Sequence, residues 1–159
     1  MPQTGPVNPA LPKIFHGGDY NPDQWDEQTR IDDVRLMKLA GVNMMSTGIF
    51  SWAQIEPADG QFNWGWLDDT FDRLGEAGVF VALATPSASP PHWLADKYPE
   101  IQAVYKDGRR ALPGGRGTSC PTSPVFRRET QRINHALAER YGGHPALGLW
   151  HVSNEYGHL

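Results

Sequence analysis

The chain has 159 residues, enough for about one domain, and 39% of them are hydrophobic, so one core can form. Its 14 Lys and Arg are outnumbered by 18 Asp and Glu, which argues against nucleic acid as a partner because no basic field faces a phosphate backbone. One cysteine excludes an internal disulfide, and the longest apolar run, residues 79–84, is far shorter than the ~20 residues that cross a bilayer. Because no secretory signal opens the chain either, we expect a cytoplasmic protein with no membrane partner.

The first part of the chain differs in composition from the rest. Residues 1–12 contain four prolines and no apolar periodicity, so we expect a flexible leader, with order beginning near Lys13. From there, glycines and prolines separate periodic apolar segments instead of forming a low-complexity tract. Residues 13–159 are therefore predicted to form one ordered unit rich in loops.

Short apolar runs alternate with amphipathic segments along this unit. The runs predict strands at residues 14–18, 42–47, 79–84 and 147–154. The amphipathic segments predict helices, each followed by glycine, at residues 25–40, 66–77 and 124–141. In the first helix the inward positions are Ile31, Val34 and Met37, and in the last helix Pro124 takes the first position behind Ser123.

The spacing of these elements predicts the fold class. The tripeptide Ala-Gly-Val joins a helix to a strand at residues 40–42 and again at residues 77–79, a period long enough for a βαβ unit with parallel strands. Strands alternating with helices indicate an α/β fold. The first strand lacks the glycine-rich phosphate turn of a doubly wound sheet. Instead, polar and aromatic residues follow every strand, which is where a (β/α)8 barrel holds its active site.

Asn154 and Glu155 follow the fourth predicted strand and are the first candidates for chemistry. A carboxyl group on a rigid strand end, partly buried at the mouth of a pocket, suits proton donation near neutral pH, and the neighbouring amide can donate to a substrate hydroxyl. The simpler alternative is that both are turn residues, which is the more common outcome for an arbitrary Asn-Glu pair.

The six tryptophans suggest a carbohydrate site, because indole faces stack on the apolar faces of sugar rings. Trp52, in a predicted loop after the second strand, is the strongest ligand candidate, whereas Trp64 and Trp66 are interpreted as core or loop anchors.

Arg116 lies in a glycine-rich loop where its guanidinium could bind hydroxyls or a carboxylate, although a solvated arginine is the usual outcome. Cys120 is interpreted as a small buried hydrophobe, since a metal site needs about four ligands and no second cysteine is present.

Four motifs, in this order, carry a resemblance to a known family. They are Gly-Gly-Asp-Tyr-Asn-Pro-Asp-Gln-Trp at residues 17–25, Phe-Ser-Trp-Ala-Gln-Ile-Glu-Pro at residues 50–57, Pro-Pro-His-Trp-Leu at residues 90–94 and Ser-Asn-Glu-Tyr-Gly at residues 153–157. Together they resemble glycoside hydrolase family 42, the β-galactosidases, from about Ile14 to the last residue.

The resemblance implies a (β/α)8 TIM-barrel domain that hydrolyses terminal non-reducing β-D-galactosyl residues with retention of configuration. It implies that Glu155 is the general acid/base, that Asn154 contacts the sugar and that Arg116 is a further sugar-binding residue. No cofactor is required, but zinc is possible in the full-length protein, with Cys120 as a single ligand. A homotrimer is the assembly that the resemblance implies.

The same resemblance places the nucleophile on strand seven, and this chain supplies four strands. We therefore interpret residues 13–159 as the N-terminal half of the catalytic domain, truncated after strand four, and expect the isolated chain to be inactive. Glu56 and Asp19 also follow strands, but nothing in the family pattern makes either a nucleophile. Unpaired edge strands should favour association of the isolated chain. Two alternatives stay open: a non-catalytic carbohydrate-binding fragment, and a related retaining glycosidase with a different sugar preference.

Overall fold

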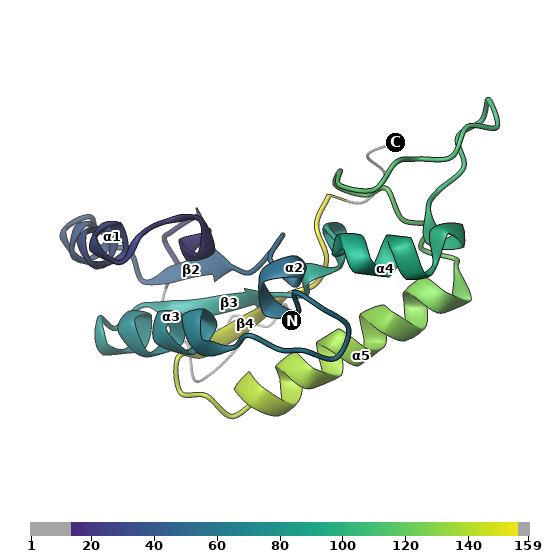
Figure 1. The fold of residues 1–159 in the computed structure, drawn as a ribbon. Helices are drawn as coiled ribbons and strands as arrows, with labels where there is room; N and C mark the ends of the chain where they lie inside the picture. The colour runs from purple at the N-terminus through teal and green to yellow at the C-terminus, as the bar shows by residue number, and fades with distance from the viewer. Residues whose placement is uncertain (1–13, 156–159) are drawn as a thin grey trace, which may run out of the picture.

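The computed structural model describes residues 14–155, so the predicted leader, residues 1–12, lies outside the described residues. One parallel sheet is formed by β1 (Asp19–Tyr20), β2 (Met44–Thr47), β3 (Phe80–Ala84) and β4 (Leu147–His151). The α-helices are α1 (Glu27–Leu39), α2 (Trp52–Ile55), α3 (Gly65–Glu76), α4 (His92–Lys97) and α5 (Pro124–Tyr141) (Figure 1). Short 3-10 turns, η1 (Pro22–Gln24), η2 (Pro86–Ala88) and η3 (Pro99–Ile101), lie in the connections.

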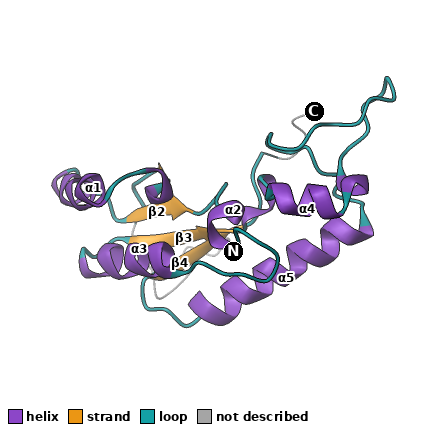
Figure 2. Cartoon of the chain, in the orientation of Figure 1, coloured by secondary structure: helices purple, strands orange, loops and turns teal. Residues whose placement is uncertain are grey.

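The strands stand in the sheet in the order in which the chain visits them, β1-β2-β3-β4, and every pairing is parallel. A long helix, α1, α3 or α5, connects each strand to the next (Figure 2). A doubly wound sheet reverses its strand order at a switch point, whereas a (β/α)8 barrel adds each strand beside the previous one. The observed order therefore confirms the predicted α/β class. It is also the order in which successive strands of a (β/α)8 barrel lie side by side.

The three long helices lie close to their predicted bounds, and in α1 and α5 a side-chain cap fixes the start. The Thr29 N–H donates to the Asp26 side chain at 2.8 Å and opens α1, and Gly41, with φ of 71°, follows its end. In α5 the Phe126 N–H donates to the Ser123 hydroxyl at 3.4 Å, with Pro124 in the first helical position. Local chemistry thus sets where these helices begin.

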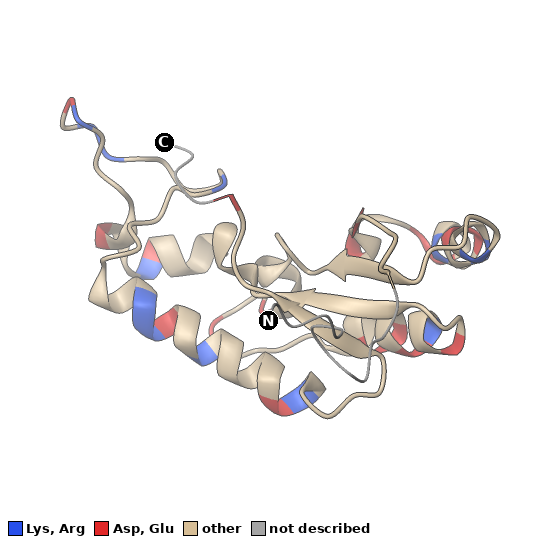
Figure 3. Cartoon of the chain, turned by 180° about the vertical axis from the view of Figure 1, so that it is seen from behind, with Lys and Arg blue, Asp and Glu red and all other residues tan. Residues whose placement is uncertain are grey.

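The core lies between one face of the sheet and the helices α3 and α5. Val81 and Leu83 of β3 are fully buried there, against a set of apolar side chains from both helices: Leu67, Phe71, Leu74, Ile133, Leu137 and Tyr141. Strands β2, β3 and β4 contain no Lys, Arg, Asp or Glu, and apart from Asp19 of β1 these charges lie on helices and loops (Figure 3). Packing of this one face fixes the sheet, so the loops after its strands gather at the same end.

The first strand lies at different residues from those predicted. The prediction was residues 14–18, but β1 begins at Asp19. Residues before it already contact β2, because the Ser46 N–H donates to the Gly18 carbonyl at 2.9 Å. Gly17 lies so close to β2 that an added Cβ would be 1.6 Å from the Met44 carbonyl oxygen. At Gly17 the two backbones approach closely without forming a regular strand pairing. Hydrophobic patterning cannot predict such a contact, because it involves no side chain.

Other differences from the predictions have simple causes. The helices α2 and α4 have 4 and 6 residues, too short for apolar periodicity to register. Strand β4 ends at His151 because the chain turns at Ser153. In α1, Met37 is buried as predicted, but Ile31 is 44% exposed, since β1 is an edge strand and no described element covers that side. Within residues 14–155, no helix is long and apolar enough to span a membrane.

Candidate functional site

The candidate residues after β4 lie in an unusual backbone turn. Ser153 and Glu155 have φ of 58° and 47°, in the left-handed region, and no other non-glycine residue of the described chain has a positive φ. This conformation is unfavourable for a residue with a side chain and concentrates at functional sites. The Glu155 side chain is 58% exposed, which is more open than the partial burial that the sequence predicts. The turn therefore presents this carboxyl group to open space beyond the sheet.

Arg116 is the side chain that the structure brings to Glu155. Its Nη1 lies 3.4 Å from Glu155 Oε2. The guanidinium also lies over the Phe50 ring, with Cζ 4.9 Å from the ring centroid. Because Phe50 follows β2, Arg116 follows β3 and Glu155 follows β4, three successive strand ends supply this arrangement. An arginine with further free N–H groups beside a carboxyl group can bind the hydroxyls of a sugar.

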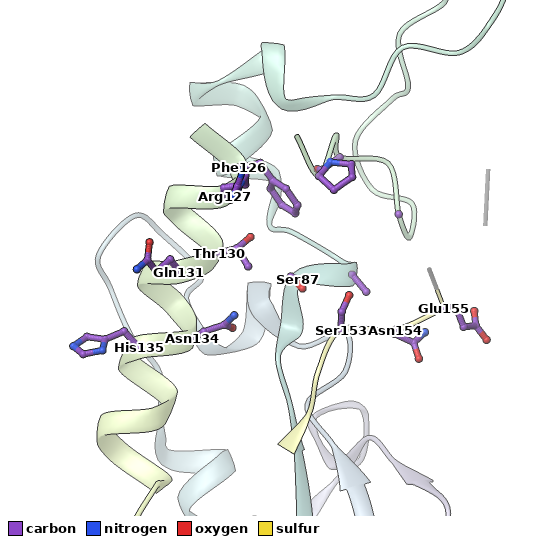
Figure 4. A pocket seen from close by; sticks show the side chains of 14 residues that line it. Ser87, Phe126, Arg127, Thr130, Gln131, Asn134, His135, Ser153, Asn154 and Glu155 are labelled. Carbon is purple, nitrogen blue, oxygen red and sulfur yellow. The ribbon is translucent and has the colours of Figure 1, made fainter. Parts of the chain in front are cut away.

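A cavity of about 750 Å³ lies beside the turn, between α5 and the ends of β3 and β4. Figure 4 shows Asn154 and Glu155 on one side and the side chains of Thr130 and Asn134 directed toward it from α5. Thr130 Oγ1 and Asn134 Oδ1 are buried and have no hydrogen-bond partner among residues 14–155. The cavity is lined by α5, by the turn η2 and by the loops before α5 and after β4. We therefore locate the candidate site at the strand ends, with the cavity as its open flank.

The position of Trp52 is at odds with its predicted role as a ligand contact. Trp52 belongs to α2, not to a loop, and its side chain is fully buried, so neither face of its indole can reach a sugar. Its Nε1–H donates to Glu56 Oε2 at 3.0 Å. Trp64 and Trp66 pack against the core, as predicted, and Trp64 stacks on Phe62 with 4.8 Å between ring centroids. The sequence suggested a sugar contact because Trp52 lies in a family motif and tryptophans often stack on sugars. In the structure its indole instead donates to the buried carboxylate of Glu56.

That buried charge is the centre of what we call the Glu56 cluster, formed by Trp52, Glu56, Gly60, Glu129 and Arg132. Arg132 reaches both carboxylate oxygens of the fully buried Glu56 at 2.9 Å, and the Gly60 N–H donates to Oε1 at 2.8 Å. Arg132 Nε donates to Glu129 Oε2 at 2.9 Å. The hydrogen bond to Glu56 raises the pKa of the Arg132 guanidinium, which therefore stays charged. Because both carboxylate oxygens of Glu56 accept hydrogen bonds, this residue links the end of α2 to α5 and is not free to attack a substrate.

Cys120 lies in the loop before α5 and is only partly exposed. Its Sγ and Thr122 Oγ1 are 3.0 Å apart and share a hydrogen bond, which lowers the pKa of the thiol. Within residues 14–155, no group of three or more His, Cys, Asp or Glu side chains is arranged to hold a metal ion. Because zinc needs about four ligands, the described residues do not form a zinc site by themselves.

Three polar features near the strand ends leave no signal in sequence patterning. Ser46 Oγ and His151 Nδ1 share a hydrogen bond of 2.7 Å. The Ser153 N–H donates to Thr85 Oγ1, also at 2.7 Å. Burial raises the pKa of the Asp23 carboxyl group in the turn η1. Each hydrogen bond joins residues far apart in the chain, so only the register of the parallel strands could have revealed it.

Comparison with known protein sequences agrees with this geometry. The sequence profile of glycoside hydrolase family 42, described as β-galactosidase, matches residues 19–159. A β-galactosidase from Arthrobacter sp is 53% identical over 156 residues, which cover 98% of this chain and 22% of that protein. A β-galactosidase from Alicyclobacillus acidocaldarius is 50% identical over 159 residues, which cover 99% of this chain and 23% of that protein. The chain thus spans less than a quarter of the length of these relatives.

Solved structures share the fold. Gan42B, a GH42 β-galactosidase of G. stearothermophilus, matches with a TM-score of 0.88 and 51% identity, over 91% of this chain and 21% of that one. A β-galactosidase from Bacillus circulans sp. alkalophilus matches with a TM-score of 0.88 and 44% identity, over 92% of this chain and 22% of that one. Together with the strand order, these matches confirm the TIM-barrel prediction, of which this chain supplies four strands.

Proposed function

Because the chain belongs to glycoside hydrolase family 42, the β-galactosidases, we propose that the protein containing it hydrolyses terminal non-reducing β-D-galactosyl residues with retention of configuration. The observation that carries this proposal is the contact of Arg116 with Glu155 across the ends of β3 and β4. Strand ends are where a TIM barrel performs its chemistry, and Glu155 lies there on a constrained turn.

In this proposal Glu155 is the general acid/base. It gives its proton to the glycosidic oxygen as the C1–O bond breaks, while a second carboxylate bonds to C1. Water then attacks C1, loses a proton to the Glu155 carboxylate and releases the second carboxylate, so two inversions give retention.

Asn154 and Arg116 are the proposed sugar contacts. The Asn154 side chain lines the cavity beside the turn, and its amide can both donate to and accept from a hydroxyl. Arg116 has further N–H groups beyond the one that faces Glu155, and the Phe50 ring holds the plane of its guanidinium. These donors support recognition of a polyhydroxylated substrate next to the acid.

The isolated 159-residue chain is proposed to be inactive. Retaining hydrolysis needs two carboxyl groups about 5–5.5 Å apart. Glu56, which also follows a strand, is committed to the Glu56 cluster and has no exposed surface. The family resemblance assigns the nucleophile to strand seven, outside the four strands described. Assembly into a homotrimer stays a prediction.

The test replaces Glu155 with Gln in the complete polypeptide that carries these residues. We expect kcat/KM for phenyl β-galactoside, whose leaving group needs protonation, to fall by about 10²–10⁴. Glu139→Gln is the matched control, because Glu139 lies on α5 with a side chain 69% exposed and contacts only His135 among described ionisable groups. Full activity of Glu155→Gln would refute the assignment.

Two further assays complete the test. Rates on nitrophenyl α-arabinoside and β-glucoside identify the preferred sugar, and a preference for glucoside would contradict the proposed specificity. The purified 159-residue chain should show no turnover. Detectable galactosidase activity of that chain, abolished by Glu155→Gln, would contradict the need for a carboxylate elsewhere.

A further inference from the structure

The turn that carries Glu155 is held from the end of the neighbouring strand. Thr85 directly follows β3 and is buried, with 8% of its surface exposed. Its N–H donates to the His151 carbonyl at 2.9 Å, and its Oγ1 accepts the Ser153 N–H at 2.7 Å. Thr85 is therefore hydrogen-bonded both to His151, the last residue of β4, and to Ser153, just beyond the end of that strand.

The second of these hydrogen bonds acts on the strained part of the backbone. The Ser153 N–H belongs to the peptide unit whose rotation sets φ of Ser153, and this φ is 58°. Without a fixed acceptor for that N–H, an L-residue with a side chain would favour a negative φ. A change in φ at Ser153 would redirect Asn154 and Glu155 together, because both follow it in the chain.

We propose that Thr85 is a positioning residue for catalysis: its hydroxyl holds the turn at Ser153 so that the Glu155 carboxyl group meets the glycosidic oxygen beside Arg116. This inference rests on the proposed role of Glu155 as the acid/base. The contact of 3.4 Å between Arg116 and Glu155 shows where the turn now places the carboxyl group. Thr85 itself is buried and acts only through the backbone of Ser153.

Thr47 provides a matched control at the end of the adjacent strand. It is fully buried, and its Oγ1–H donates to the Tyr20 carbonyl at 2.8 Å. Thr47→Val removes a buried strand-end hydrogen bond of the same kind without touching the turn at residues 153–155. Thr85→Val removes the acceptor for the Ser153 N–H and keeps the β-branched shape, and Thr85→Ser restores a hydroxyl.

The experiment measures kcat/KM of these variants of the complete polypeptide on phenyl β-galactoside and on 2,4-dinitrophenyl β-galactoside. Phenolate is a poor leaving group that needs protonation, whereas dinitrophenolate leaves without it. For Thr85→Val we expect kcat/KM to fall about 10- to 100-fold on the phenyl substrate and about 3-fold or less on the dinitrophenyl substrate. Thr85→Ser should recover most of the loss, and Thr47→Val should lower the melting temperature but keep the wild-type ratio between the two substrates.

Equal losses on both substrates, or no loss on either, would overturn the inference. If Thr85→Val does not fold, Thr85→Ala removes the same acceptor with less bulk and is judged by the same ratio. Glu155→Gln separates the two proposals. If that variant is fully active, the proposed function fails, whereas a defective Glu155→Gln beside an unaffected Thr85→Val refutes only the role of Thr85.

Discussion

Arg132→Met is the substitution whose effect follows most directly from the structure. It removes the guanidinium from the Glu56 cluster and leaves Glu56 with two neutral donors, Trp52 Nε1–H and the Gly60 N–H. Breaking a buried ion pair from one side costs about 3–5 kcal/mol, because the remaining charge is desolvated. The Arg132 side chain is 35% exposed, so water can partly replace it. We therefore expect about 3 kcal/mol, the lower end of that range.

Hydrogen exchange is the suitable assay, because the Gly60 amide reports directly on the cluster. This N–H donates to Glu56 Oε1 and exchanges only when the contact opens. A loss of about 3 kcal/mol corresponds to about 10²-fold faster exchange, at 1.4 kcal/mol for each factor of ten. The peptide that contains Gly60, measured by mass spectrometry on the complete polypeptide, should show this change.

Arg128→Met is the matched control for that experiment. Arg128 also lies on α5 and also contacts Glu129, at 2.9 Å, but its side chain is 58% exposed. Although Glu129 is buried, it keeps its contact with Arg132 when Arg128 is replaced, and the Arg128 guanidinium is largely in solvent. We therefore expect a cost of about 0–1 kcal/mol, so exchange at Gly60 should change by less than about 5-fold. If Arg132→Met and Arg128→Met gave the same exchange rates, the buried ion pair would have no special role and the reasoning would be wrong.

Two further predictions concern the amino-terminal part of the chain. Burial raises the pKa of Asp23 above 3.8, so the stability that its protonated form provides is present below 3.8 and is lost as pH rises through the folded-state pKa. Asp23→Asn should therefore melt above wild type at pH ~7 and together with it at pH ~3; a lower melting temperature at the higher pH would contradict this. Gly17→Ala should cost about 3 kcal/mol or prevent folding, because its Cβ would meet the Met44 carbonyl oxygen at 1.6 Å. Gly18→Ala, with no atom within 4 Å of its added Cβ, should cost about 1 kcal/mol or less, and equal urea midpoints for the two variants would refute the argument.

Amphipathic periodicity predicts the long helices of this fold well, and the reason is visible in α5. Ile133, Leu137 and Tyr141 recur at the helical interval and are all buried against β3. Periodicity fails to predict an element that is too short to show a pattern. It also fails where two backbones pack directly against each other with no side chain between them. The helix α4 is an example of the first case, and the contact of Gly17 with Met44 is an example of the second.

In the candidate site, too, features that depend on local sequence can be predicted, whereas contacts between residues far apart in the chain cannot. Asn154 and Glu155 are candidates because of their place after an apolar strand, and Arg116 because of its glycine-rich loop and the family resemblance. Burial of Trp52 could not be predicted, because it results from packing in the core and from a hydrogen bond to Glu56, which Arg132 pairs with from a helix far along the chain. Thr85 is one of the polar residues that follow the predicted strands, but its contact with Ser153 could not be predicted, since it depends on the register that sets Ala84 beside His151.

The two glutamates that follow strands differ in their environments, and the difference separates a structural carboxylate, Glu56, from Glu155, which we propose as the acid/base. Glu56 has no exposed surface and meets donors at both oxygens, so neither a substrate nor a proton from solvent can reach it without unfolding α2 from α5. Within the described chain, the Glu155 side chain is 58% exposed and contacts Arg116 at 3.4 Å. A general acid must exchange its proton in every turnover, which the first environment prevents and the second permits. The positive φ values of Ser153 and Glu155 set the direction in which the backbone presents this carboxyl group.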